Sequence, residues 1–232
     1  MTSWPDRVVD AAVPALRACA DADRAPQMAA YMKHVAPFLG VSAVPRRAAL
    51  RDAWRDLPAP TSDELGRAAV ELMAQPEREL HYAAYDLIDR YRTVADDRFC
   101  PDHVERLLTT KPWWDTVDGL VSAAVSPLCR RFDHHDLIDR WSASGDRWLV
   151  RAAIDHQRGW KDATDTARVL DLCDQHWAES EFFIAKAIGW ALRDLARLDP
   201  GAVMAFLAAH PERNTVAERE ARRGLEARPR RG

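Results

Sequence analysis

The spacing of apolar residues constrains the fold of this 232-residue chain more than any other feature. Apolar side chains recur three or four positions apart along nearly the whole sequence, which is the period of an amphipathic α-helix. The alternation typical of a β-strand never extends beyond a few residues. Only 9 glycines interrupt the pattern. We therefore predict an all-α fold.

Prolines mark the junctions between the predicted helices, because proline lacks a backbone N–H and fits best at helix ends. The junction prolines are Pro37, Pro45, Pro58, Pro60, Pro76, Pro101, Pro112, Pro200 and Pro211. The predicted helices cover residues 5–22, 25–36, 44–57, 62–75, 78–94, 101–110, 113–131, 135–144, 146–158, 163–177, 180–198, 200–210 and 214–228.

A weak internal repeat is formed by four of these segments: 81-HYAAYDLIDRYRTV, 113-WWDTVDGLVSAAV, 147-RWLVRAAIDHQRG and 182-FFIAKAIGWALRDL. Their starts lie about 32 to 35 residues apart, within the range of helical-pair repeats. Bulky aromatic residues followed by small apolar ones suit close helix stacking in a solenoid, and such arrays curve around a concave groove. We expect one domain over residues 1–228 and a disordered basic tail at residues 229–232.

Charge and cysteine content limit the partners and the compartment. The net charge is −3 and the pI about 6.2, so a polyanion would have to meet a local patch of positive charge. The four cysteines lie far apart without a Cys-x-x-Cys pair, which argues against disulfides and zinc. The sequence shows neither an apolar leader nor an apolar segment of bilayer length, so we expect a cytoplasmic protein without a membrane partner.

The helix predicted at residues 113–131 carries an apolar stripe of expected core residues: Trp113, Val117, Leu120 and Ala124. Trp114 and Asp118 lie on a neighbouring stripe, and their i, i+4 spacing directs the ring and the carboxylate toward the same volume. Asp115, in the first turn, favours the helix dipole. Trp114 and Asp118 are either an aromatic face and an acid placed for chemistry, or an ordinary structural pair.

Two other predicted helices carry rows of cations. The helix at residues 180–198 has a face that holds Lys186, Trp190, Arg193 and Arg197, beside its core stripe. The helix at residues 146–158 has a side that holds Arg147, Arg151 and Arg158. Arginine binds phosphate oxygens in a bidentate fork, so stacked rows would form a basic groove for a polyanion. The alternative is a set of salt-bridged surface arginines.

Motifs for other chemistry are missing from the sequence. It contains no Gly-rich phosphate loop, no HExxH and no GxSxG. His134 and His135, flanked by Asp133 and Asp136, suggest a metal, but a polar turn between helices is the simpler interpretation. We expect no metal and no cofactor.

A family resemblance is carried by four segments, in their order and spacing: 31-YMKHVAPFLGV, 113-WWDTVD, 148-WLVRAAI and 181-EFFIAKAIGWALRD. The chain resembles the AlkD-type DNA alkylation repair glycosylases over about residues 25–228. The strings WWDTVD and KAIGWALR are long and therefore specific. The resemblance implies a right-handed superhelical solenoid of HEAT-like antiparallel helix pairs with a concave basic groove. It also implies hydrolysis of the N-glycosidic bond of cationic alkylated purines in duplex DNA, without a deep base-flipping pocket.

The resemblance assigns roles to residues of this chain. Asp118 corresponds to the catalytic aspartate, and Trp114 and Trp190 correspond to the two tryptophans of the cleft. The residues expected to contact DNA, from the resemblance or from the cation rows, are Tyr31, Arg147, Arg151, Arg158, Lys161, Lys186, Arg193 and Arg197. The chain departs from the pattern at Gly159, where we would expect a basic residue. We expect a monomer that acts on double-stranded DNA containing alkylated bases, without an obligate protein partner, and that associates with the nucleoid when bound.

Two other functions stay open. A helical-repeat protein can keep a basic groove and bind damaged or unusual DNA without catalysis, although the presence of Asp118 with both tryptophans argues against this. A peptide-binding scaffold would need an apolar groove in place of the arginine rows. Loss of binding at raised salt would separate a DNA-binding protein from a peptide-binding one.

Overall fold

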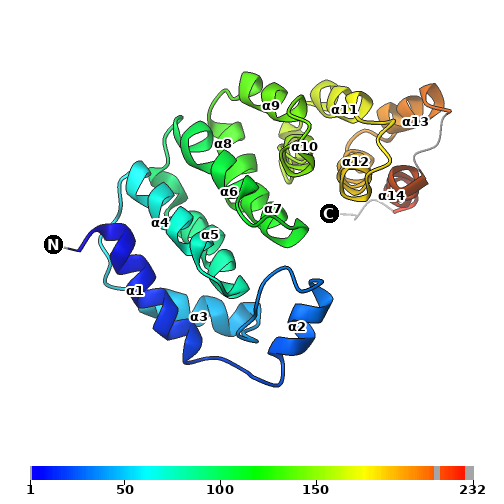
Figure 1. Cartoon of the computed structure of the whole chain (residues 1–232). Helices are drawn as coiled ribbons and strands as arrows, with labels where there is room; N and C mark the ends of the chain where they lie inside the picture. The colour runs from blue at the N-terminus through cyan, green and yellow to red at the C-terminus, as the bar shows by residue number, and fades with distance from the viewer. Residues whose placement is uncertain (1, 212–214, 228–232) are drawn as a thin grey trace. The chain divides into compact units, whose positions relative to one another are not determined.

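The computed structural model describes residues 2–211 and 215–227, and every regular element in these ranges is a helix. The chain divides into two compact units, Met1–Leu128 and Cys129–Gly232. In Figure 1 the first unit runs from blue to green and the second from green to red. The predicted all-α class is confirmed.

The first unit begins with four helices that share a core: α1 (Trp4–Arg17), α3 (Ala43–Ala53), α4 (Ser62–Ala74) and α5 (Arg78–Tyr91). Figure 1 shows α1, α4 and α5 side by side. Their apolar faces meet at a set of fully buried side chains: Val8, Leu16, Leu50, Leu65, Leu72 and Leu87. The short connection between α4 and α5 reverses the chain, so this pair packs antiparallel. A further helix, α2 (Ala25–Tyr31), has no buried residue.

A long helix at residues 114–131 consists of three consecutive pieces: α7 (Trp114–Leu120), the π-helical turn η3 (Val121–Val125) and α8 (Ser126–Arg131). The π turn lies directly before Pro127. In a regular α-helix the ring of Pro127 would clash with the carbonyl four residues earlier, and a widened turn relieves this clash. The helix can therefore continue through a proline. A second π turn, η2 (Cys100–Val104), leads into α6 (Glu105–Thr109).

Within residues 129–211 and 215–227, the second unit contains six further α-helices: α9 (His135–Ser142), α10 (Arg147–Ile154), α11 (Thr166–Gln175), α12 (Phe182–Leu195), α13 (Pro200–Ala209) and α14 (Thr215–Glu226). Buried residues from five of them, all but α9, form one apolar cluster that includes Ile154, Val169, Ile188, Val203 and Ala217. The helices α12 and α14 pack especially closely. A Cβ atom added at Gly224 of α14 would lie only 2.6 Å from the carbonyl oxygen of Arg193.

Acidic and hydroxyl side chains fix the starts of several helices by accepting hydrogen bonds from amides that have no partner within the helix. Thr61 and Glu64 form a reciprocal capping box at the start of α4. Asp146 accepts from Trp148 N at 2.8 Å at the start of α10, and Glu181 accepts from Phe183 N at 2.7 Å at the start of α12. These caps position the two helices of the second unit that carry predicted site residues.

Predicted and observed helices agree in order, and they differ mainly at their ends. The predicted helix 5–22 ends at Arg17, and the predicted helix 146–158 ends at Ile154. In the second case the amide of His156 bonds the Ala153 carbonyl in a tight turn, which takes the chain off the helix axis. The solenoid handedness, the concave groove and the single domain over residues 1–228 stay predictions. The predicted tail at residues 229–232 lies outside the described residues.

Two further properties of the described residues concern membrane spans and cysteines. No helix among them combines the length and the apolar character that a membrane span requires. The cysteines are free thiols, with Cys100 and Cys173 buried, Cys129 half-buried and Cys19 exposed.

Candidate functional site

Trp114 and Asp118 lie one turn apart on α7, and both side chains are half-buried. Trp113 is the residue before the helix, in extended conformation with φ −155° and ψ 163°. The Thr116 hydroxyl accepts from Trp113 N at 3.3 Å and donates to Trp113 O at 3.1 Å, which fixes this start. The prediction that Trp113 is a core residue is wrong. Because α7 begins one residue later than assumed, Trp113 is only half-buried, while Val117 and Leu120 are buried as predicted.

Tyr31 and Trp114 come together although they are far apart in the sequence. Their rings meet edge to face, with centroids 6.3 Å apart and planes at 82°. Tyr31 ends α2 and is 71% exposed. The chain then turns through Lys33 and His34, whose φ angles of 58° and 56° lie in the left-handed region that non-glycine residues rarely adopt. A strained turn thus holds the exposed tyrosine beside Trp114.

Behind α7 lies a buried ion pair between Arg78 of α5 and Asp115. Arg78 Nη2 lies 2.5 Å from Asp115 Oδ1, and Arg78 Nε lies 3.1 Å from Oδ2. The Tyr82 hydroxyl also donates to Asp115, at 2.5 Å. Asp115 therefore does more than favour the helix dipole, because it ties the first turn of α7 to α5. A buried pair of this kind is costly to break, since the remaining charge has no partner.

The protonation state of His81 follows from its two partners in this network. His81 Nε2 lies 2.7 Å from the Gln75 carbonyl oxygen, so Nε2 carries the proton. His81 Nδ1 then accepts from Arg78 Nη1 at 3.2 Å. Burial lowers the pKa of His81 to about 4, and the neighbouring Arg78 acts in the same direction. The imidazole is neutral near pH 7.

A second buried arginine contacts Tyr85, and the Tyr85 ring packs against Gly119, the residue that follows Asp118. Arg46 is buried, bonds Asp86 at 2.9 Å and lies over the Tyr82 ring at 4.9 Å. It also donates to the Tyr85 hydroxyl at 3.4 Å. A Cβ atom at Gly119 would lie 2.5 Å from the Tyr85 ring, so only glycine allows α7 this close to α5. This contact fixes the depth of the helix turn that carries Asp118.

In the second unit Trp190 lies against two guanidinium groups. The Cζ atoms of Arg151 and Arg158 are 4.9 Å and 5.1 Å from the ring centroid. Arg151 is only 1% exposed, and its Nη1 donates to the Phe183 carbonyl at 2.7 Å. Its guanidinium thus has partners inside the chain, and its predicted contact with DNA phosphate stays a prediction. Arg158 lies in the turn after α10, so the predicted helical row of Arg147, Arg151 and Arg158 is wrong.

The predicted cation row of residues 180–198 is engaged in ion pairs, and its last member, Arg197, lies beyond the end of α12 at Leu195. Lys186 Nζ and Arg193 Nη1 lie 2.9 Å and 3.0 Å from the two carboxylate oxygens of Glu220. Arg197 pairs with Asp194 at 3.0 Å. On α10, Arg147 pairs with Glu181 at 3.3 Å. The salt-bridged alternative is therefore correct in part, although these cations remain at the surface.

Three predicted DNA-contacting residues line one pocket of about 350 Å³ in the second unit: Arg158, Lys161 and Arg197. The apolar part of its lining includes Ile154, Val169 and Leu195. Gly159, which replaces the expected basic residue, has a φ of 81° and open space around its Cβ position. Left-handed backbone at this point favours glycine. Lys161 adopts the same region with a φ of 53°.

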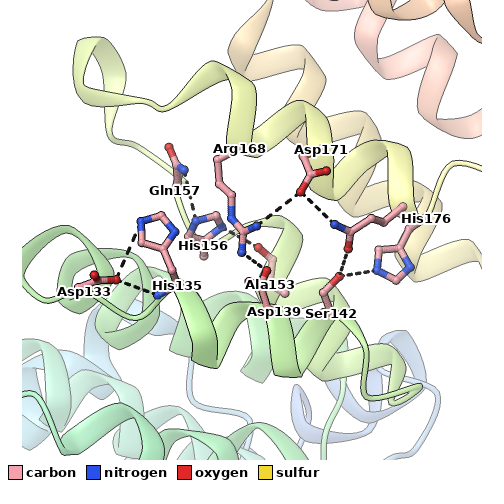
Figure 2. A network of polar contacts seen from close by, with 11 residues as sticks. Asp133, His135, Asp139, Ser142, Ala153, His156, Gln157, Arg168, Asp171 and His176 are labelled. Atoms are coloured by element: carbon pink, nitrogen blue, oxygen red, sulfur yellow. Dashed lines mark hydrogen bonds and ion pairs between the residues drawn. The ribbon is translucent and has the colours of Figure 1, made fainter.

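A polar network holds the turn that carries Arg158 and Lys161, and Figure 2 shows its contacts at His156 and Gln157. Gln157 Oε1 accepts from Asp165 N at 2.7 Å, and Gln157 Nε2 lies 3.3 Å from His156 Nε2. His156 Nδ1 donates to the Ala153 carbonyl at 2.7 Å. Burial lowers the pKa of His156 to about 4, so it acts as a neutral acceptor for Gln157.

The same network continues between α9 and α11 in Figure 2. Arg168 bonds Asp139 and lies 3.5 Å from Asp171. The Ser142 hydroxyl lies 2.8 Å from His176 Nε2. Asp133 accepts from His135 N at 3.1 Å between α8 and α9, which confirms the predicted polar turn at this position. Among the residues that the structure describes, no group of three or more potential ligands is arranged to hold a metal ion.

A family model described as DNA alkylation repair enzyme matches residues 13–225. The chain belongs to this family. It therefore has a role in the repair of alkylated DNA. A solved structure described as "Predicted DNA alkylation repair enzyme from Enterococcus faecalis" has a similar fold, with a TM-score of 0.74 and 24% identity. The similarity covers 87% of this chain and 94% of that chain. No curated protein matches the chain.

In this DNA alkylation repair protein, several residues that support candidate site residues of their own unit escaped prediction from the sequence. They are Arg46, Arg78, Tyr82, Tyr85 and Glu220. Tyr82, Tyr85 and Asp86 follow helical spacing within 81-HYAAYDLIDRYRTV, a signal for one polar face. Glu220 shares a stripe with small residues of α14, which is the sequence signature of an acid at a close helix contact.

Proposed function

We propose that this protein is a DNA glycosylase that hydrolyses the N-glycosidic bond of cationic alkylated purines in duplex DNA. Substrates of the N3-methyladenine and N7-methylguanine type fit this chemistry. The observation that carries the proposal is the placement of Asp118 one turn from Trp114, with Tyr31 against the same indole. One partly exposed carboxylate thus shares a face of α7 with the Trp114 indole, against which the Tyr31 ring of α2 lies.

The chemistry follows from the charge of the substrate. Alkylation at N3 or N7 makes the purine cationic, so the base leaves as a neutral molecule when the bond to C1′ breaks. The sugar then carries oxocarbenium character, which the Asp118 carboxylate stabilises. A water molecule attacks C1′ and gives up a proton, for which Asp118 is the proposed acceptor. The products are the free base and an abasic site.

The aromatic residues have a separate role in this proposal. Trp114 and Trp190 offer electron-rich faces to the cationic nucleotide and its sugar, and each such contact is worth about 0.5 to 2 kcal/mol. The lesion is selected by its charge and lability, without a deep base-reading pocket. A neutral damaged base is then a poor substrate.

The decisive test compares Asp118→Asn with wild type on duplex DNA that contains N7-methylguanine. The amide is nearly isosteric but lacks the negative charge, so we expect base release to fall by about a hundredfold or more while binding is retained. Asp89→Asn, at an exposed position of α5, is the charge-matched control and should release base normally. Equal release by Asp118→Asn would remove this residue from the mechanism. Binding of alkylated DNA by wild type without base release would favour the non-catalytic alternative.

A further inference from the structure

We propose that Lys186, Arg193 and Arg223 form one phosphate-binding site that the buried carboxylate of Glu220 organises. The inference rests on the proposed function, because it assigns the site to a phosphate of the DNA substrate. Lys186 and Arg193 belong to α12, and Glu220 and Arg223 belong to α14. The site therefore joins two helices of the same unit.

Both oxygens of the Glu220 carboxylate are occupied. Oε1 accepts from Lys186 Nζ at 2.9 Å and from Arg223 Nη1 at 3.0 Å. Oε2 accepts from Arg193 Nη1 at 3.0 Å. Glu220 is only 1% exposed. Burial opposes its ionisation, but the hydrogen bond from Lys186 and the charges of Lys186, Arg223 and Arg193 outweigh burial and lower the pKa of the carboxyl.

The charge of this cluster exceeds what the carboxylate needs. One cation neutralises Glu220, so three cations leave an excess of two positive charges within a few ångströms. Like charges at such distances repel one another, and the repulsion is relieved when an anion binds. Lysine has three N–H donors and arginine has five, so each cation retains donors beyond its bond to Glu220. The side chains of Lys186, Arg193 and Arg223 are 23%, 32% and 59% exposed, so an anion can reach them.

Close packing of the two helices fixes the carboxylate. A Cβ atom at Gly189 would lie 2.8 Å from the Glu220 Cβ, so the glycine lets α14 approach α12 at this point. Trp190 follows Gly189, and it lies four residues after Lys186 and three before Arg193, on a common helix face. A phosphate bound here would therefore lie beside the nucleotide that Trp190 is proposed to meet.

Two neighbouring arginines of α14 provide a matched test. Arg222→Ala and Arg223→Ala remove the same charge from side chains that are 57% and 59% exposed, but Arg222 pairs with Glu218 instead of Glu220. Binding to an undamaged duplex oligonucleotide is measured over a range of salt concentrations. We expect Arg223→Ala to weaken binding roughly three- to tenfold and to reduce the log–log salt slope by about one unit. Arg222→Ala should change neither the affinity for DNA nor the salt slope. Equal effects of the two variants would overturn the site, because they would reflect net charge alone.

The direction in which Glu220→Gln changes DNA affinity separates an organising role of Glu220 from an effect of net charge. Net charge alone predicts tighter DNA binding, because a negative charge is removed from a basic surface. An organising role predicts weaker binding, because Lys186 and Arg193 lose the partner that orients them. We expect binding about threefold weaker or more, as for a lost charge-assisted hydrogen bond. Tighter binding by a folded Glu220→Gln protein would overturn the organising role.

The outcomes distinguish this site from the proposed function. If wild type binds duplex DNA and releases alkylated bases, equal behaviour of Arg222→Ala and Arg223→Ala overturns the phosphate site alone. If only Arg223→Ala shows the reduced slope and no alkylated base is released, the glycosylase proposal fails and the phosphate site stands. If wild type does not bind duplex DNA, both are wrong.

Discussion

At the scale of single residues, Trp190 both packs against other side chains and keeps part of its ring accessible. Its ring contacts the guanidinium groups of Arg151 and Arg158, and its remaining surface is partly exposed. Trp190→Phe keeps an aromatic face, so we expect it to retain part of the rate of base release. Trp190→Ala should lose about two- to thirtyfold, the equivalent of one cation–π contact.

The control for Trp190 is a tryptophan with a purely structural position. Trp141 is buried, and Trp141→Ala should cost about 3 to 5 kcal/mol of unfolding free energy. Thermal unfolding separates the two cases. If Trp190→Ala unfolds as readily as Trp141→Ala while the folded fraction releases base normally, Trp190 is a core residue.

Arg151 is buried, whereas its predicted contact with DNA requires an accessible side chain. Its partners include Trp190 and the Phe183 carbonyl, so Arg151→Ala should lower base release and the melting temperature. The salt slope of DNA binding tests the predicted phosphate contact, and an unchanged slope would contradict it. Lys161→Ala is the contrasting variant, because Lys161 is exposed at the rim of the pocket, and its slope should fall by about one unit. A slope one unit shallower for Arg151→Ala would mean that its guanidinium leaves Phe183 for a phosphate.

At the scale of helices, the contact between α12 and α14 depends on small residues. Gly224→Ala would place a Cβ 2.6 Å from the Arg193 carbonyl oxygen and 2.9 Å from its Cα, both backbone atoms that cannot move aside. We expect a loss of about 1 to 3 kcal/mol in unfolding free energy, more than the gain in helix propensity. Gly201→Ala in α13 has only one atom near, at 3.5 Å, and should be neutral or slightly stabilising. Denaturant unfolding of both variants tests the difference.

Helix order was predictable because amphipathic periodicity and proline positions are local signals. The ends of the helices were less predictable, as α10 shows. The pattern of Arg147, Arg151 and Arg158 continues at helical spacing, but a tight turn ends the helix at Ile154. The Asp165 amide then donates to the Gln157 side chain eight residues earlier, a contact that helical periodicity does not reveal.

At the scale of the whole molecule, each unit contains a buried neutral histidine, His81 in the first and His156 in the second. Both have a pKa of about 4 in the folded protein, below the ordinary value of 6.5. Between these values the unfolded chain binds more protons than the folded chain. Their contribution is therefore complete above pH 6.5 and is lost as the pH falls toward 4, by up to about 1.4 kcal/mol per pH unit for each histidine.

The measurement is unfolding free energy as a function of pH for wild type and for a His81→Gln, His156→Gln double variant. We expect the variant to be less stable near pH 7 and to lose less stability between pH 6.5 and pH 4. Curves of equal steepness would show that neither histidine is kept neutral by the fold.

The partly exposed residues of the candidate site were predictable from the sequence, and the residues that support them were not. Trp114, Asp118 and Trp190 carry family signals in strings of sequence. Glu220, by contrast, lies about thirty residues beyond its partners on α12, and its role depends on how closely two helices pack. Spacing within one helix cannot show which charge from another helix neutralises a row of cations.

The π turn at Val121–Val125 has a consequence for how the face of α7 is aimed. It adds one residue to the helix, and one residue corresponds to about 100° of rotation around an α-helix axis. Trp114 and Asp118 therefore point about 100° away from where uninterrupted winding from α8 would direct them. Pro127 and the extra residue together set the rotation of α7 relative to α8 about the helix axis. A single-residue deletion in this turn would rotate the Trp114 ring and the Asp118 carboxylate together, away from Tyr31. Neither residue would itself be substituted.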